Sequence, residues 1–193
     1  MVAASGSVVT KERFDGAPTY PEYLDALDKG RPRYQDNYDA IDVSDDDARF
    51  FKELANRPGG PARVLVITEF WCPDCFREVP VMAKIAEAAG MDLRVLARDE
   101  NLDAINEFLK DGQFQSIPVF VFYTKDHEYI THWIERTQLA NHEMHLLREV
   151  SEGKSKEEAR EDVLAFYKGE TWARWRRATI AELKEKLAAA TKS

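Results

Sequence analysis

Cysteine is scarce in this sequence of 193 residues, which contains only two. So few cysteines exclude a small secreted scaffold that several disulfides hold together. Basic residues are outnumbered as well, with 27 Lys and Arg against 35 Asp and Glu, which gives a net charge of -8. Because this charge repels phosphate groups, we expect neither a nucleic acid nor a membrane as a partner.

Long apolar runs are also missing. No stretch approaches the roughly 20 residues that span a bilayer. The first ten residues lack the basic segment and the apolar core of a secretory signal, so we expect a cytoplasmic protein. Hydrophobic residues at 44% and aromatic residues at 11% supply enough material for a folded core.

The distribution of apolar and turn-forming residues predicts three segments, 1–60, 61–136 and 137–193, that make up effectively one domain. The first segment is polar and rich in proline, so we expect helical pieces packed on the core rather than strands. The last segment is helical nearly to its end. Its final helix, over 171–190, carries an apolar stripe that is expected to pack on the rest of the protein.

The middle segment alternates strands with helices. Residues 63–68 form a β-branched run typical of a strand that is buried on both faces. The next expected elements are a helix over 75–89, a strand over 93–97, a helix over 102–110, and strands over 118–124 and 128–134. This order predicts an α/β fold with a central mixed sheet flanked by helices, a helical N-terminal segment and a C-terminal helical extension.

The two cysteines lie three positions apart, between the first strand and the helix that follows it. If Cys72 caps that helix, the unpaired backbone N–H groups and the positive end of the helix dipole favour its thiolate. Cys75 lies one turn further and is expected to be more buried. We therefore predict that Cys72 is a nucleophile and that Cys75 resolves the mixed disulfide that Cys72 forms.

The motif Trp71-Cys72-Pro73-Asp74-Cys75 resembles the active-site signature of the thioredoxin family. Two further prolines agree with this resemblance. Pro80 stands where thioredoxins carry a helix-kinking proline, and Pro118 stands where they carry a cis-proline. The resemblance covers about residues 63–135 and implies a thioredoxin-like fold with thiol-disulfide oxidoreductase activity.

The resemblance also implies the contacts that a substrate makes. Pro118 is expected beside the sulfurs, and the backbone of Ile117 is expected to pair with an extended substrate segment. Trp71 is expected to offer a flat contact surface, with Pro73 and Asp74 next to it. No cofactor and no metal are implied. The expected partners are a disulfide-containing protein substrate and an unidentified electron donor.

The direction of the reaction is predicted to be reduction. The negative charge of Asp74 competes for the helix dipole and raises the pKa of the neighbouring thiol, which argues against a strongly oxidising site. Thioredoxins also have a buried aspartate that passes protons to the inner cysteine, but Val66 occupies that position here. Glu69 is the nearest substitute, and we predict that it carries the proton.

Three alternatives stay open on the sequence alone. The fold could serve as a partner-binding module or a redox sensor without general reductase turnover. The cysteines could bind zinc together with His142 and His145, although the histidine spacing is shorter than usual. The cysteines could also be small buried core residues.

Overall fold

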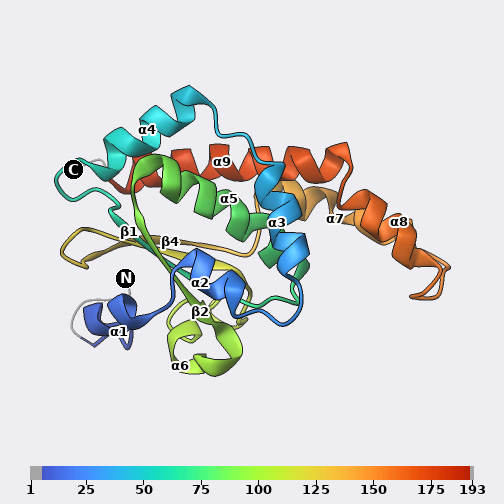
Figure 1. Cartoon of the computed structure of the whole chain (residues 1–193), viewed down its shortest axis with the longest axis horizontal. Helices are drawn as coiled ribbons and strands as arrows, with labels where there is room; N and C mark the ends of the chain where they lie inside the picture. The colour runs from blue at the N-terminus through green and yellow to red at the C-terminus, as the bar shows by residue number, and fades with distance from the viewer. Residues whose placement is uncertain (1–5, 192–193) are drawn as a thin grey trace.

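A single mixed sheet forms the centre of the protein, in a computed structural model that describes residues 6–191 (Figure 1). Its strands are β1 (Arg63–Thr68), β2 (Asp92–Ala97), β3 (Val119–Tyr123) and β4 (Tyr129–Ile134). The strand order is β2-β1-β3-β4. β1 is parallel to β2, whereas β1 with β3 and β3 with β4 are antiparallel. This arrangement confirms the predicted α/β architecture.

Helices flank the sheet and fill both ends of the described chain. The N-terminal segment forms α1 (Lys11–Gly16), α2 (Tyr20–Asp25), α3 (Arg31–Asp39) and α4 (Asp45–Ala55). The middle segment contributes α5 (Pro73–Ala89), the short 3-10 helix η1 (Arg98–Glu100) and α6 (Leu102–Ile105). The C-terminal extension forms α7 (Gln138–Ser151), α8 (Ala159–Phe166) and α9 (Glu170–Ala190). The division at residues 60 and 136 stays a prediction, and residues 1–5 and 192–193 lie outside the described part.

Strand β1 is buried from Val64 to Thr68, as its β-branched sequence predicts. Side chains alternate between the two faces of a strand. Thr68 therefore shares a face with Val64 and Val66, and this is the face where its hydroxyl meets that of Tyr34 from α3. The strand thus ends with a polar side chain inside the core, directly before the loop that carries the cysteines.

Helix α5 follows that loop and is the centre of the helical layer. Cys72 is its N-cap residue, Pro73 occupies its first turn, and Gly90 ends it with a φ of 72°. Proline suits the first turn because its fixed φ is already helical. The N–H group that proline lacks would have no hydrogen-bond partner within the helix at this position. α3, α4 and α9 all pack against α5 (Figure 1). The first turn of α5 is therefore enclosed by segments from both ends of the chain.

The predicted helix over 102–110 is wrong in its length, because α6 ends at Ile105. The N–H groups of Glu107 and Phe108 bond to carbonyls only three residues back, so the helix tightens into turns. Asp111 and Gly112 then have positive φ values of 54° and 69°. A right-handed helix does not continue through residues with positive φ.

The C-terminal extension packs on the domain as its apolar stripe predicted. The five stripe residues of α9 are all buried, namely Trp172, Trp175, Ile180, Leu183 and Leu187. Among the helices of residues 6–191, none is both long enough and apolar enough to pass through a membrane.

Candidate active site

The two cysteines meet the loop before β3 at the start of α5. Both are thiols without a disulfide between them. Cys72 is 9% exposed and Cys75 is fully buried. The Cys72 thiol donates a hydrogen bond to the carbonyl oxygen of Ile117 at 3.7 Å, and the peptide bond between Ile117 and Pro118 is cis. Residues that lie 45 positions apart in sequence therefore share one site.

The environment shifts the acidity of the two thiols in opposite directions. The pKa of Cys72 is lowered mainly by a hydrogen bond from Cys75, and the backbone N–H groups of Cys75 and Asp74 lower it further. Burial of Cys72 and the negative charge of the Asp74 side chain act in the opposite direction and raise this pKa. The pKa of Cys75 is raised well above its ordinary value, first by burial and then by Cys72. The arrangement therefore favours a thiolate at Cys72 and a neutral thiol at Cys75.

The surface beside Cys72 is aromatic and partly charged. Trp71 is 47% exposed, and the guanidinium of Arg98 lies 5.1 Å from the centre of its ring. Arg98 also donates a hydrogen bond to the carbonyl of Gln115 at 3.4 Å, which ties the tryptophan side of the site to the loop before Pro118. Trp71 is thus held at the rim of the site by a contact worth about 0.5–1 kcal/mol at exposed positions.

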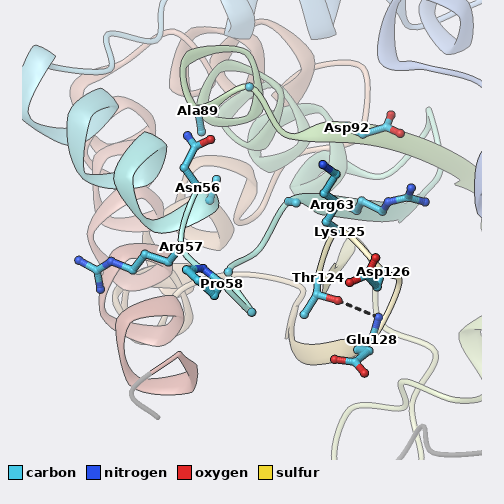
Figure 2. A pocket seen from close by; sticks show the side chains of 15 residues that line it. Asn56, Arg57, Pro58, Arg63, Ala89, Asp92, Thr124, Lys125, Asp126 and Glu128 are labelled. Atoms are coloured by element: carbon cyan, nitrogen blue, oxygen red, sulfur yellow. Dashed lines mark hydrogen bonds between the residues drawn. The ribbon is translucent and has the colours of Figure 1, made fainter.

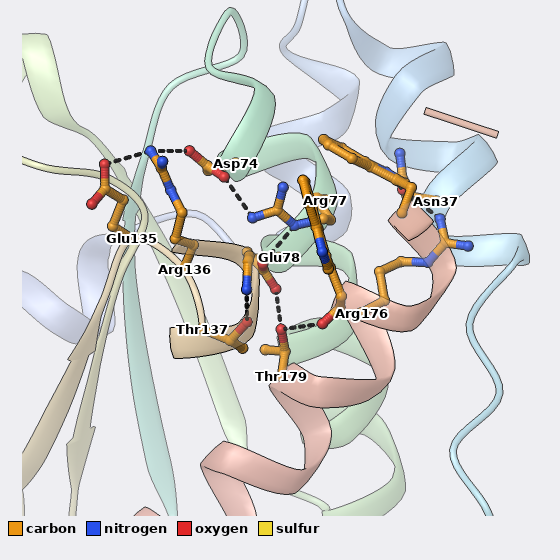
Figure 3. Close-up of polar contacts among 12 residues, drawn as sticks. Asn37, Asp74, Arg77, Glu78, Glu135, Arg136, Thr137, Arg176 and Thr179 are labelled. Carbon is orange, nitrogen blue, oxygen red and sulfur yellow. Dashed lines mark hydrogen bonds and ion pairs between the residues drawn. The ribbon is translucent and has the colours of Figure 1, made fainter. Parts of the chain in front are cut away.

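Asp74 is not an exposed charge at the helix start, because two arginines pair with it. Its carboxylate accepts a hydrogen bond from Arg77 at 2.5 Å and forms an ion pair with Arg136 at 2.7 Å (Figure 3). Arg136 follows β4, so the end of the sheet also contacts the first turn of α5. The two cations offset the negative charge that Asp74 brings beside Cys72.

A buried ion pair between Arg77 and Glu78 on α5 extends this network. Arg77 is fully buried and contacts Glu78 at 2.6 Å. Glu78 in turn accepts a hydrogen bond of 2.5 Å from the hydroxyl of Thr179 on α9 (Figure 3). The Arg77 guanidinium lies 4.5 Å from the ring centre of Trp172. Burial raises the pKa of Glu78 although Arg77 opposes the shift. The C-terminal extension therefore supports the turn that carries the cysteines.

Glu69, the predicted proton carrier, is 7% exposed and close to the site. Its carboxylate accepts a hydrogen bond from the backbone N–H of Asp99 at 2.8 Å, and burial raises its pKa. The hydroxyl of Thr68 and the backbone of Glu69 both lower the pKa of the Cys75 thiol, against the larger effects of burial and Cys72. The hydroxyl of Thr68 therefore lies between the buried thiol and the rest of the polar core.

Two other features lie apart from the cysteines. A cleft of about 660 Å³ opens at the start of β1, around Arg63 and Lys125, whereas the cysteines follow the end of that strand (Figure 2). Its lining holds three basic and three acidic side chains, so no charge dominates. Within residues 6–191, His142 and His145 do not gather with the cysteines into a cluster of three or more possible metal ligands.

The sequence reasoning missed Thr68, Tyr34, Arg77 and Arg136. Two of these left a local signal: Thr68 is the polar end of an apolar strand, and Arg77 follows Asp74 at the spacing that places two side chains on one helix face. Tyr34 and Arg136 had no such signal, because only the tertiary fold brings them to the cysteines.

Comparisons with known proteins agree with this geometry. The sequence model of a family described as Thioredoxin matches residues 17–151. The fold is similar to that of a protein of unknown function from Pseudomonas aeruginosa, with 14% identity, a TM-score of 0.64, and coverage of 92% of this chain and 96% of that chain. It is also similar to an HIV epitope-scaffold, with 15% identity, a TM-score of 0.62 and the same coverage. No curated protein matches the sequence. Because the family match spans well over half of the chain, the protein belongs to the thioredoxin family.

Proposed function

We propose that this protein is a thiol-disulfide oxidoreductase that reduces disulfides in protein substrates. The observation that carries the proposal is the opposite pKa shift of the two thiols at the start of α5, lowered at Cys72 and raised at Cys75. A thiolate is the attacking species in disulfide exchange, and a neighbouring thiol is needed to release the product.

The reaction follows from these two thiols. The Cys72 thiolate attacks one sulfur of the substrate disulfide, so a mixed disulfide forms and the other substrate sulfur leaves as a thiolate. Cys75 then loses its proton and attacks the sulfur of Cys72. The second substrate thiolate leaves, and two electrons have passed from the dithiol to the substrate. A separate electron donor must then reduce the Cys72–Cys75 disulfide.

The residues around the thiols have proposed supporting roles. Trp71 and Pro73 are exposed beside Cys72 and offer apolar contact to a substrate. The Ile117–Pro118 segment lies against the Cys72 sulfur, where its backbone is available to orient an extended peptide. Asp74 adjusts the charge at the nucleophile together with its two arginines.

Reduction is the proposed direction because two effects counteract the lowering of the Cys72 pKa. The charge of Asp74 and burial both oppose ionisation of Cys72. Strong oxidants of this kind owe their potential to a stabilised reduced form. Burial and Asp74 limit how far the pKa of Cys72 falls, and a less stabilised thiolate gives up electrons more readily.

The reduction potential of the Cys72–Cys75 couple tests the proposal. The protein is equilibrated in defined thiol-disulfide buffers, and free thiols are trapped and counted by mass, with a Cys72→Ser variant as control. A potential near roughly -270 mV supports a reductase, and one near roughly -120 mV reverses the direction. A protein that forms no Cys72–Cys75 disulfide in any buffer is not an oxidoreductase of this type.

A further inference from the structure

Release of the mixed disulfide requires a way out for the proton of Cys75. This thiol is fully buried, so bulk water does not reach it directly. Burial also raises its pKa, which means that it enters the reaction with its proton attached. A thiol must lose this proton to attack the sulfur of Cys72.

A row of buried hydroxyl groups begins at Cys75. The Thr68 hydroxyl is near enough to the buried Cys75 thiol to lower its pKa and lies 3.2 Å from the hydroxyl of Tyr34. The rings of Tyr34 and Tyr23 pack edge to face with their centres 6.0 Å apart, and each tyrosine shifts the pKa of the other. A hydroxyl group donates one hydrogen bond and accepts others at the same time, so each member is able to pass a proton to the next.

The row ends at a second cleft, which has a volume of about 630 Å³. Tyr23 and Glu69 both line it, and the charge of Glu69 raises the pKa of Tyr23. The other charged side chains of its lining are Asp28, Lys29, Asp99 and Glu100. Of the carboxylates in the lining, Glu69 is the one whose charge acts on Tyr23, and its raised pKa makes it a better proton acceptor than an ordinary glutamate.

The local backbone brings α3 and its tyrosine to this place. Gly30, just before α3, has a φ of 88°, and a Cβ there would lie 3.3 Å from the carbonyl oxygen of Phe70. Only glycine adopts this conformation in contact with the active-site loop at low cost. Tyr34 then reaches both Thr68 and the carbonyl oxygen of Glu69, each at 3.2 Å.

We infer that Thr68, Tyr34 and Tyr23 form a proton path from Cys75 to this second cleft, where Glu69 or water receives the proton. The inference rests on the proposed function. The thiol proton moves along the row, the Cys75 thiolate forms the S–S bond with Cys72, and the substrate thiolate that leaves takes a proton from solvent. Atoms and charge therefore balance without any further reactant.

The test separates the two steps of the reaction. One equivalent of 5,5′-dithiobis(2-nitrobenzoic acid) reacts with Cys72 and releases one coloured thiolate, and attack by Cys75 releases the second. Thr68→Val and Tyr34→Phe are expected to leave the first release unchanged and to slow the second by about tenfold to hundredfold at neutral pH. Tyr20→Phe is the control, because Tyr20 is also buried but its hydroxyl has no hydrogen-bond partner within residues 6–191.

The pH dependence distinguishes a proton path from a packing effect. Raising the pH should restore the second release in Thr68→Val and Tyr34→Phe, because a higher pH increases the equilibrium fraction of Cys75 thiolate by whatever route the proton leaves, whereas a packing defect slows the release at every pH. Thr68→Ser keeps the hydroxyl and should resolve at the native rate, and this variant serves if Thr68→Val does not fold. Glu69→Gln should also slow the second release.

The outcomes for the path and for the proposed function differ. If the unsubstituted protein releases only one equivalent, Cys75 does not resolve and the proposed function fails together with the path. If it releases two, and Tyr34→Phe resolves as fast as Tyr20→Phe at every pH, the function stands and the path is refuted.

Discussion

Replacing Arg77 by methionine tests the buried network that joins α5 to α9. Arg77 is fully buried, pairs with Asp74 and Glu78, and lies 4.5 Å from the ring centre of Trp172. Methionine keeps much of the apolar volume but removes the positive charge. The variant therefore leaves Glu78 in the core with the hydroxyl of Thr179 as its remaining partner.

The expected loss of stability is large. Removing one member of a buried ion pair usually costs about 3–5 kcal/mol, because the other charge stays buried without compensation. We expect about 3 kcal/mol, the lower end of that range, because Asp74 keeps Arg136. With a urea slope of about 2 kcal/mol per molar, the unfolding midpoint falls by about 1.5 M.

Urea unfolding of the reduced protein measures this loss, and a second substitution shows its cause. Glu78→Gln in the Arg77→Met background removes the stranded carboxylate, so the double variant should recover part of the lost stability, by about 1–3 kcal/mol of coupling. Alkylation of Cys72 gives a second readout: without Arg77 the charge of Asp74 is less compensated, and the pKa of Cys72 should rise.

Two results would refute this reasoning. A loss below about 1 kcal/mol for Arg77→Met is typical of a surface position and would mean that the pair does not matter for stability. A double variant less stable than Arg77→Met alone would mean that Glu78 stabilises the fold without its arginine.

Three further outcomes follow from the site. Iodoacetamide at limiting amounts should label Cys72 before Cys75, and Asp74→Asn should speed this labelling below neutral pH, because it removes the charge that opposes the lowered pKa of Cys72. Trp71→Ala should change the free energy of unfolding by less than about 0.5 kcal/mol but raise the KM for a disulfide-bonded protein several-fold, because the side chain is at the surface. Burial raises the pKa of Glu69 in the folded protein, so ionisation of this group destabilises the fold as the pH rises through that raised pKa. Glu69→Gln should therefore be more stable than the native protein at neutral pH in urea titrations, and the difference should vanish below the ordinary pKa of glutamate.

The prediction of the first strand and the cysteine helix depended on local chemistry and was accurate. The β-branched run at Arg63–Thr68 is a strand in the structure, and α5 ends at Ala89, where the predicted helix ends. Both features follow from residues close together in the chain. The helix after Leu102 was predicted too long, since its apolar spacing continues while the backbone already forms turns.

The contacts of the residues that support the two thiols could not be predicted from the sequence in the same way. The sequence predicted that the charge of Asp74 raises the pKa of the neighbouring thiol, but not that Asp74 contacts Arg136, which is 62 residues further along the chain. Tyr34 approaches Cys75 from a segment that the sequence described only as polar and helical. Pairings of this kind depend on how helices pack, and no periodicity encodes them.

The sequence by itself determined the chemistry: two thiols at the start of a helix, after a buried strand, with a tryptophan before them. Helix ends and strand alternation depend on residues that are close in the sequence, so these features could be predicted from short segments of the chain. Only the tertiary structure decided how the thiols are supported, because the supporting contacts join distant segments. Tyr34 of α3 meets Thr68, Thr179 of α9 bonds to Glu78, and Arg136 after β4 pairs with Asp74. Burial removes water as a partner, so these buried polar groups require one another, and the packing of distant segments selects which of them meet.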